Sequence, residues 1–296
     1  MTTILVTGGA GQLATAMEQE GGAVVRRVGR PGFDFDRASS VHEAMQAARP
    51  AFVVNAAAWT AVDAAEADPD GAGRANRDGP AVLAALCADA GIPLIHVSTD
   101  YVFDGDKGAP YVETDPTSPT GVYGSTKLEG EQAMLAACPQ AVVLRTSWVY
   151  SAVGKNFVRT MLGAAHKTGR LRVVADQQGC PTAARDLAVA ILAVVARLRD
   201  GWRDSYAGVF HAAGTGATTW HGLAEAIFQD AAQYGHPVPV VDAISTADWP
   251  TPARRPPDSR LDCTKLAQVF DVRLPPWRAA VSRTVAELLA APPLRS

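Results

Sequence analysis

Two side chains that can move a proton, Tyr123 and Lys127, lie four residues apart in the sequence. On a helix, residues four apart share one face, so these side chains would lie next to each other. A free tyrosine has a pKa of about 10, and a neighbouring ammonium lowers that pKa by favouring the phenolate. The spacing therefore predicts that Tyr123 transfers a proton and that Lys127 tunes it. The alternative is an ordinary pair on an amphipathic helix, because this spacing also arises by chance.

A glycine-rich turn at residues 8–11 separates the apolar run 4–7 from a helical pattern that starts at Gln12. Strand, turn and helix in this order are the context of a dinucleotide-binding fingerprint. Gly8 permits the tight turn. Gly11 lets the backbone approach a pyrophosphate at the helix N-terminus, where free N–H groups favour an anion. We predict dinucleotide binding here, against the alternative of an ordinary tight turn.

Basic residues follow the second predicted strand, at the place where dehydrogenases that prefer NAD often carry an acidic residue. Arg26, Arg27 and Arg30 occupy this region, and no carboxylate stands between the predicted strand and Asp34. Guanidinium groups suit the 2′-phosphate of NADP(H), so we expect NADPH as the cofactor, with NADH as a second one that the protein could accept. The alternative is that these arginines are solvated loop charges. Asp34 and Phe35 could still lie beside the adenine.

Thr99 follows the predicted strand 93–98, which places it at the carboxyl edge of the sheet. Ligands of open α/β sheets bind at that edge. The Thr99 hydroxyl could hydrogen-bond the oxygen of a substrate, and Lys127 could also donate to the nicotinamide ribose. We therefore expect Thr99, Tyr123 and Lys127 to act together as catalytic residues.

The elements that must position these residues alternate along the chain between strands and helices. The predicted strands are continuous apolar runs, which is typical of strands covered on both faces. This alternation predicts an α/β fold, a Rossmann-type doubly wound parallel sheet with a smaller, interleaved C-terminal substrate lobe. The expected elements of the first half are strands at 4–7, 23–25, 51–55, 93–98 and 141–145, and helices from 12, at 41–49, 80–90 and 124–137.

The second half of the chain is less regular. We expect residues 1–150 to form the dinucleotide-binding domain, with segments near 170–200 returning to it, and 151–296 to form mainly the substrate-binding lobe. The stretch 237–257 is rich in proline, and we expect an irregular loop there. The other expected elements are strands at 172–174 and 208–211 and helices at 185–199, 219–234 and 277–289.

Composition excludes several classes of protein. With 296 residues and 48% of them hydrophobic, the chain can build a core, so global disorder is excluded. Lys and Arg number 27 against 30 Asp and Glu, which leaves no basic surplus for binding nucleic acid. No apolar run approaches the roughly 20 residues of a membrane span. The N-terminus lacks the basic and apolar regions of a signal peptide, so we expect a cytoplasmic protein.

The cysteines and histidines give no sign of a metal centre. Cys87, Cys138, Cys180 and Cys263 are widely spaced and contain no Cys-x-x-Cys pair, which favours reduced thiols. The 6 histidines form no His-Glu-x-x-His motif. We therefore predict no catalytic metal.

With these motifs in place, the sequence resembles the extended short-chain dehydrogenase/reductases and, more closely, the dTDP-4-dehydrorhamnose reductase family. The resemblance spans nearly the whole chain, and its last segments lie in the expected substrate lobe, where unrelated reductases differ. The segments that carry it are VNAAAWTAVDAAE (54–66), HVSTDYVFDG (96–105), YGSTKLEGE (123–131), LRTSWVY (144–150), NF (156–157), DQQGCPT (176–182) and PARRP (252–256).

The resemblance implies reduction of the C4 ketone of dTDP-4-dehydro-β-L-rhamnose to dTDP-β-L-rhamnose, the final step of dTDP-L-rhamnose biosynthesis. It implies that Tyr123 is the general acid, Lys127 its partner and Thr99 the hydroxyl that orients the ketone. Asp100 would contact the sugar, and Trp148 would pack on the sugar or base unless it is part of the core. The residues that the resemblance places at the cofactor are Gly11, Gln12 and Leu13 at the diphosphate, Asp34 and Phe35 at the adenosine, and Ala58, Trp59, Thr60 and Val97 at its middle.

Five polar residues outside these sets also have a purely structural interpretation. Arg254 and Arg255 in the proline-rich stretch could bind the substrate diphosphate, since guanidinium groups bind phosphate in a bidentate manner, or could be surface charge. Asn55 could simply stabilise a turn after its strand. Asp63, like nearby Glu66, could only stabilise the start of a helix.

The sequence also departs from the family pattern. Ala14 stands where a glycine is usual, and Trp59 stands where Tyr or His is commoner. Some family members form dimers through carboxylates and a metal, and we align Ala16 and Arg185 with two of those carboxylates, although Glu287 remains. We therefore expect a monomer or a weak homodimer without that metal.

Two other functions stay open. The protein could be a reductase or epimerase for another nucleotide-linked keto-sugar, since the scaffold is shared. A 4,6-dehydratase is disfavoured, because Tyr101 to Phe103 follow Asp100 where such enzymes usually carry a glutamate. It could also be a regulatory subunit that binds the cofactor without catalysis, although Thr99, Tyr123 and Lys127 are all present.

Overall fold

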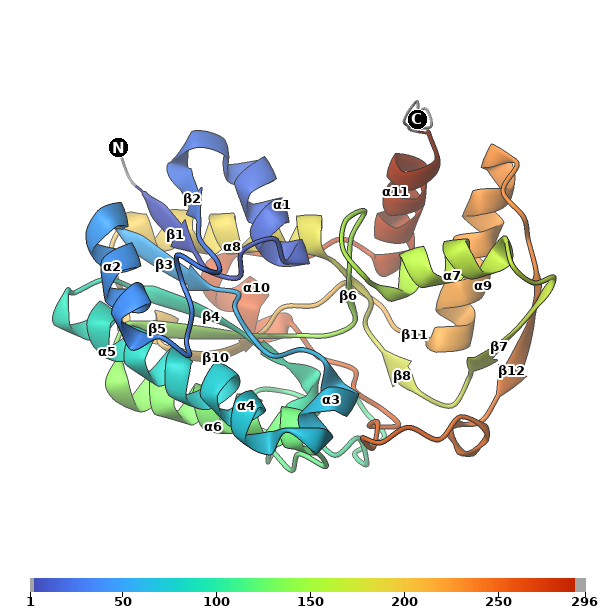
Figure 1. Ribbon diagram of the computed structural model, residues 1–296, viewed down its shortest axis with the longest axis horizontal. Coiled ribbons are helices and arrows are strands. Elements are labelled where there is room, and N and C mark those ends of the chain that lie inside the picture. Colours follow the sequence, from blue (N-terminus) through green and yellow to red (C-terminus); the bar gives the residue numbers. More distant parts are fainter. Residues whose placement is uncertain (1–2, 291–296) are drawn as a thin grey trace.

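Short runs of apolar residues form the strands at the centre of the molecule. The computed structural model describes residues 3–290, and its largest sheet has six strands in the order β10-β5-β4-β3-β1-β2, all parallel (Figure 1). This confirms the expected doubly wound parallel sheet. The strands of this sheet are β1 (Ile4–Val6), β2 (Val25–Arg27), β3 (Phe52–Asn55), β4 (Leu94–Thr99), β5 (Ala141–Thr146) and β10 (Gly208–His211).

Alternate side chains of these strands enter two different cores, because successive side chains of a strand point to opposite faces. Ile4 and Val6 of β1 face the core that holds Leu13 and Met17 of α1, whereas Leu5 faces the other core. The sheet is therefore buried on both sides. The helices on the first face are α1 (Gln12–Gly21), α8 (Ala184–Arg199) and α10 (Thr264–Phe270), and those on the second are α2 (Ala38–Ala48), α5 (Gly79–Asp89) and α6 (Val122–Ala137).

A second group of elements lies beyond the carboxyl edge of the large sheet, on the right of Figure 1. Three helices pack around apolar cores there, and a two-stranded parallel sheet joins β7 to β12. Two small strand pairs, β6 with β9 and β8 with β11, lie between the two groups. The bounds are α7 (Phe157–Ala165), α9 (Trp220–Ala231), α11 (Trp277–Ala290), β6 (Val149–Tyr150), β7 (Arg170–Val174), β8 (Gln178–Gly179), β9 (Thr182–Ala183), β11 (Thr218–Thr219) and β12 (Val240–Ile244).

The chain passes between the groups more than once. After β7, helix α8 packs against α1, and β10 adds a strand beside β5 of the large sheet. The short helices α3 (Val62–Ala67) and α4 (Pro69–Gly73) continue into a helical turn at Arg74–Asp78 that contacts α6. The division into a domain at 1–150 and a lobe at 151–296 remains a prediction.

Two sequence expectations were wrong. The second strand is Val25–Arg27, not 23–25, because residues 22–24 form a 3-10 turn after α1. The proline-rich stretch 237–257 is not wholly irregular, since it contains strand β12. Pairing with β7 supplies the hydrogen bonds that form this strand, and that partner lies far away in the sequence.

Candidate active site

The turn between β1 and α1 is shaped to receive an anion. Gly8 has φ of +105°, and a Cβ there would lie 2.9 Å from the carbonyl oxygen of Ala56, so only glycine fits. Helix α1 begins after Gly11, whose backbone is extended and which offers no side-chain cap. The first N–H groups of α1 therefore lack a side-chain partner and can bind a phosphate.

A cavity of about 810 Å³ runs from this turn along the carboxyl edge of the sheet. Of the residues predicted for the site, all but Arg254 and Arg255 line this cavity. Those that line it are Gly8, Gly11, Gln12, Leu13, Arg30, Asp34, Phe35, Ala58, Trp59, Thr60, Val97, Thr99, Asp100, Tyr123, Lys127 and Trp148. One cavity thus joins the glycine-rich turn to the residues expected to move a proton.

Only one of the three arginines expected near the adenosine lines the cavity. Arg30 lies there and forms ion pairs of 3.0 Å with both Asp34 and Asp36. Arg26 donates instead to a backbone carbonyl at the end of α2, and Arg27 pairs with Glu18 of α1 at 2.9 Å. The argument for a 2′-phosphate site therefore depends on Arg30 alone.

Helix α6 presents Tyr123 and Lys127 on its buried face. The Lys127 ammonium nitrogen lies 2.8 Å from the carbonyl oxygen of Val97 and 3.0 Å from Nε2 of His96. Burial lowers the pKa of Lys127 to about 8 and raises that of Tyr123 to about 12. The expected lowering of the Tyr123 pKa by Lys127 is thus wrong for this structure, because desolvation of the phenolate dominates. A phenol with a raised pKa keeps its proton at neutral pH, as a proton donor must.

Thr99 and Asp100 lie where β4 ends. The Thr99 hydroxyl donates to Oδ1 of Asp100 at 3.1 Å, and a hydrogen bond with Thr99 lowers the Tyr123 pKa slightly against the effect of burial. Asp100 is only 2% exposed, and its Oδ2 has no hydrogen-bond partner in the described residues. Burial raises the pKa of Asp100 to about 6, although hydrogen bonds with Ser259 and Thr99 oppose this. Asp100 nevertheless lines the cavity, and a carboxylate in the cavity wall can accept a hydrogen bond from a ligand hydroxyl.

Trp148 closes the cavity at the second group of elements. Its ring stacks on Trp220 of α9 with centroids 3.5 Å apart and planes 6° from parallel. A Cβ on Gly179 would lie 2.4 Å from the Trp148 indole, so this glycine makes room for the ring. Trp148 has φ of +48°, a strained backbone for a large side chain. Trp148 is therefore both packed into the protein and available at the cavity wall.

The two arginines of the proline-rich stretch lie outside the cavity lining. Arg255 is largely buried and pairs with Asp63 of α3 at 2.8 Å, and Asp63 also accepts the Ala253 N–H. This pair lowers the Asp63 pKa despite a contrary effect of burial. Arg254 is exposed and lies 3.9 Å from Asp106. Asp63 therefore does more than stabilise a helix start, and diphosphate binding by these arginines stays a prediction.

Several residues at the site were not predicted from the sequence. Ser98 and Thr146 line the cavity, and each carries a buried hydroxyl with no partner in the described residues. Lys155 and Trp220 also line it. Ser98 has a position signal, since it precedes Thr99 at the end of a strand, whereas Lys155 and Trp220 reach the cavity only through the tertiary fold.

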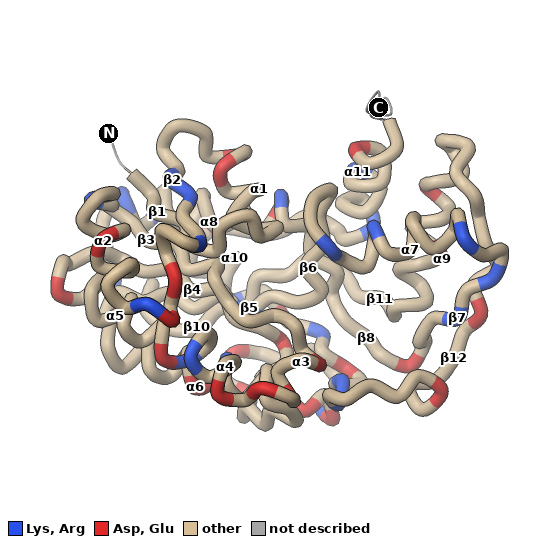
Figure 2. Tube along the Cα trace, in the orientation of Figure 1, with Lys and Arg blue, Asp and Glu red and all other residues tan. Residues whose placement is uncertain are grey.

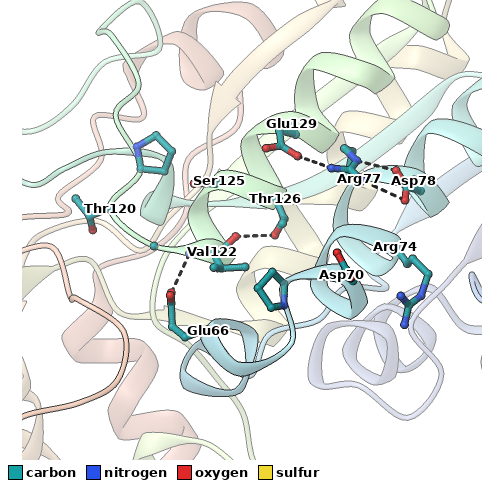
Figure 3. A pocket seen from close by; sticks show the side chains of 13 residues that line it. Glu66, Asp70, Arg74, Arg77, Asp78, Thr120, Val122, Ser125, Thr126 and Glu129 are labelled. Atoms are coloured by element: carbon teal, nitrogen blue, oxygen red, sulfur yellow. Dashed lines mark hydrogen bonds and ion pairs between the residues drawn. The ribbon is translucent and has the colours of Figure 1, made fainter.

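A second hollow, of about 730 Å³, lies on the outer side of α6 (Figure 3). Three of its charged side chains, Arg77, Asp78 and Glu129, are paired with one another. Arg77 binds Glu129 at 3.0 Å and Asp78 at 2.7 Å, and Glu66 accepts the Val122 N–H at 2.8 Å. The residues with candidate catalytic chemistry line the first cavity, so we place the site at the sheet edge.

Charged residues of both signs occur throughout the described part of the chain (Figure 2). Figure 2 shows acidic and basic residues interspersed along the chain, in keeping with a formal net charge of −3. Within residues 3–290, no helix combines the length and the apolar character needed to cross a bilayer. Over the same residues, three or more His, Cys, Asp or Glu side chains nowhere come together in a way that could hold a metal ion.

Comparison with known proteins agrees with this geometry. The family model described as "RmlD substrate binding domain" matches residues 1–290. The dTDP-4-dehydrorhamnose reductase of Sinorhizobium fredii is 45% identical over 289 residues, which covers 97% of each chain. A Streptomyces antibioticus protein named a probable dTDP-4,6-dihydroxy-2-methyloxan-3-one 4-ketoreductase is 40% identical over 98% of each chain.

A solved structure extends this comparison. The dTDP-4-dehydrorhamnose reductase of Bacillus anthracis, in complex with NADP, superposes with a TM-score of 0.88 at 30% identity and covers 97% of this chain and 100% of its own. Both the sequence and the fold are thus shared over nearly the full length. The chain belongs to the dTDP-4-dehydrorhamnose reductase family.

Proposed function

We propose that this protein reduces the C4 ketone of dTDP-4-dehydro-β-L-rhamnose to dTDP-β-L-rhamnose with NADPH as the reductant. The observation that carries the proposal is the single cavity that holds both the glycine-rich turn and Thr99, Tyr123 and Lys127. Similarity at 45% identity to a dTDP-4-dehydrorhamnose reductase supports the substrate, and the NADP complex of a relative supports the cofactor.

The residues present fit a dinucleotide. The uncapped start of α1 and the close approach at Gly8 leave room for a diphosphate. Arg30 would contact the adenosine end, between Asp34 and Phe35, and its guanidinium suits a 2′-phosphate. Lys127 would donate to the nicotinamide ribose, since Lys127 lines the same cavity.

NADPH, when bound, supplies the hydride that reduces a carbonyl carbon. The chain supplies the proton. Tyr123 donates from its hydroxyl to the developing alkoxide, because burial keeps the phenol protonated. Thr99 orients the ketone oxygen from the end of β4, and Lys127 stabilises the tyrosinate that remains.

Substrate contacts come from both groups of elements. Asp100 would accept a sugar hydroxyl from the cavity wall, and Trp148 would pack on the sugar or base. Arg254 and Arg255 would approach the diphosphate from the proline-rich stretch. We also expect a monomer or a weak homodimer, since Ala16 and Arg185 stand at positions that we align with two carboxylates of the metal-linked dimers.

The test is NADPH oxidation, followed by absorbance, with dTDP-4-dehydro-β-L-rhamnose as substrate. The wild type should oxidise NADPH, and Tyr123→Phe should lose activity by about 10²–10⁴-fold because the proton donor is gone. NADPH binding by the variant, measured by fluorescence, controls for folding. Activity that survives in Tyr123→Phe would remove this residue as the acid, and no oxidation by a folded wild type would overturn the assignment.

The Streptomyces antibioticus relative favours a second candidate, a 4-ketoreductase for another dTDP-linked keto-sugar. The two candidates share the chemistry and differ in the substrate. Comparison of kcat/KM for the two sugars would separate them, since the true substrate should be preferred by at least about tenfold. Turnover of either sugar would exclude a purely regulatory role.

A further inference from the structure

A chain of buried hydrogen bonds links the first strand to Lys127. Thr7 Oγ1 lies 2.6 Å from Asn55 Oδ1, Asn55 Nδ2 lies 2.9 Å from His96 Nδ1, and His96 Nε2 lies 3.0 Å from Lys127 Nζ. All four side chains are at most 1% exposed. The hydrogen-bonded chain starts at Thr7, just after β1, passes through β3 and β4 and ends on α6 beside the cavity.

Backbone N–H groups fix the direction of the first bonds. The Thr7 hydroxyl accepts from the N–H groups of Ala56 at 3.2 Å and Ala57 at 3.1 Å, so its own proton is directed to Asn55 Oδ1. Asn55 Oδ1 also accepts the Ala57 N–H at 3.2 Å. The amide oxygen of Asn55 is therefore held at Thr7, and its NH₂ group must donate to His96 Nδ1.

This direction assigns the tautomer of His96. A ring nitrogen that accepts a hydrogen bond carries no proton, so neutral His96 is protonated at Nε2. The Nε2–H then points at Lys127 Nζ, which can accept it only as an unprotonated amine, because an ammonium offers no lone pair. The amine still donates one of its protons to the Val97 carbonyl at 2.8 Å.

We propose that His96 is a positioning residue of the active site, whose Nε2–H opposes the ammonium form of Lys127 and donates to its amine once that amine has lost its charge. The proposal deepens the proposed ketoreduction and rests on it for its catalytic consequence. A charged Lys127 makes Tyr123 a stronger acid, whereas a neutral one does not. His96 therefore sets the pH at which Lys127 loses its charge and the proton donor weakens.

The other groups around Lys127 are accounted for. Glu131, one turn along α6, raises the Lys127 pKa, but its carboxylate is bound by Arg145 of β5 at 2.6 Å. Asp100 at the end of β4 accepts from Thr99. Charged groups of α3 and of the turn Arg74–Asp78 bind the outer side of α6, as Arg77 binds Glu129. Asp70 of α4 and Asp89 of α5 are exposed.

Burial and the Lys127 charge both hold the pKa of His96 well below its usual value, which agrees with a neutral ring.

The direct test is the tautomer of His96, measured by ¹⁵N NMR of the wild type without substrate. At about pH 9, the ring should carry its proton on Nε2. The 6 histidines of the chain keep the spectrum simple, and loss of one signal in His96→Gln assigns it. A proton on Nδ1, or an imidazolium, would overturn the proposal.

Two variants test the effect on Lys127, with its pKa read from ¹³C-labelled lysine. Asn55→Asp places an acceptor at His96 Nδ1 and should move the ring proton there, so that Nε2 accepts from an ammonium and the Lys127 pKa rises by about one unit or more. His96→Gln replaces the ring with an uncharged amide, which can turn its oxygen toward Lys127. This variant should raise the Lys127 pKa by about 0.5–1 unit, because the Nε2–H donor is gone. The chain's other lysines, Lys107, Lys155, Lys167 and Lys265, serve as internal controls.

The alkaline limb of the kcat profile for keto-sugar reduction should move to higher pH by the same amounts. A Lys127 pKa that stays within about 0.3 unit of the wild type, or falls, in both variants would overturn the proposal. Because the NMR measurements need no keto-sugar, failure here is distinguishable from failure of the proposed reaction.

Discussion

Burial of the Asp100 carboxyl group disfavours its ionised form, although this side chain is proposed to bind the substrate. Its carboxyl group is buried beside the cavity with one unpartnered oxygen, and burial raises its pKa to about 6. The native protein therefore binds this proton more tightly than the unfolded chain does. As pH rises from about 4 to about 6, stability from this group is lost, because the buried carboxylate must ionise.

Asp100→Asn removes this ionisation. Relative to the wild type, the variant should be more stable at pH 8 by on the order of 1–3 kcal/mol, with little difference near pH 4. Turnover should fall, since the variant replaces a carboxylate in the cavity wall with an uncharged amide. Thermal unfolding at both pH values measures the first effect. An equal shift in Tm at pH 4 and pH 8 would contradict the assigned titration.

Arg30 is the second residue whose role can be tested alone. It is the one arginine of its loop that lines the cavity, although Asp34 and Asp36 compete for it. Arg30→Ala should raise KM for NADPH by about tenfold and leave KM for NADH nearly unchanged, because only NADPH has the 2′-phosphate. Equal changes in KM for both cofactors would mean that Arg30 does not bind that phosphate.

For single residues, the sequence predicted which side chains line the cavity better than it predicted their pKa values and their ion-pair partners. The glycine turn and the order of Thr99, Tyr123 and Lys127 are local patterns, and their residues do line one cavity. The direction of the Tyr123 pKa was wrong, since burial depends on tertiary packing. For the same reason, the partner of Arg255 on α3 could not be read from the sequence.

Helix α6 and strand β5 are joined by a buried ion pair. Glu131 and Arg145 approach to 2.6 Å with side-chain exposures of 2% and 4%, and Arg145 also stacks over Phe103 with its guanidinium carbon 5.1 Å from the ring centroid. A buried pair stabilises little overall, but loss of one partner leaves an isolated buried charge. The pair therefore fixes how α6, with Tyr123 and Lys127, sits on the sheet.

Glu131→Ala should lower the free energy of unfolding by about 3–5 kcal/mol. The matched control is Glu129→Ala on the same helix, whose partner Arg77 is half exposed, and which should cost about 1 kcal/mol or less. Denaturant unfolding measures both. A further change, Arg145→Met in the Glu131→Ala background, should recover part of the loss, and similar costs for Glu131→Ala and Glu129→Ala would contradict this account.

Elements with strong local signals were predicted well, and those that depend on distant partners were not. The strand near 94–99 and the helix near 122–137 follow from continuous apolar and helical patterns. Strand β12 was missed because it forms by pairing with β7, some seventy positions earlier in the chain. Strand β2 was misplaced because residues 22–24, two of which were expected in that strand, form a 3-10 turn after α1.

At the scale of the whole molecule, the ion pair between Asp63 and Arg255 ties the proline-rich stretch to α3 beside the cavity. This contact links residues 192 positions apart. The pair is partly exposed, so its contribution to stability is small. Its effect is to hold the stretch that carries Arg254 and Arg255 in place across the site.

Asp63→Asn should change stability by about 1 kcal/mol or less and yet raise KM for the sugar nucleotide by about tenfold, because the stretch is no longer fixed. Asp63→Glu, which keeps the carboxylate partner of Arg255, should retain much of the affinity if the contact acts by position. Steady-state kinetics with NADPH held at saturation measures both. An unchanged KM in Asp63→Asn would show that the contact has no part in binding.

The central claim, reduction of the sugar C4 ketone by hydride from NADPH, is tested most directly by isotope transfer. The protein would be mixed with dTDP-4-dehydro-β-L-rhamnose and NADPH deuterated at the reactive carbon of the nicotinamide, and the product examined by NMR. We predict dTDP-β-L-rhamnose with deuterium at C4 of the sugar. Deuterium at another carbon, or unchanged sugar in the presence of folded protein that binds NADPH, would contradict the account.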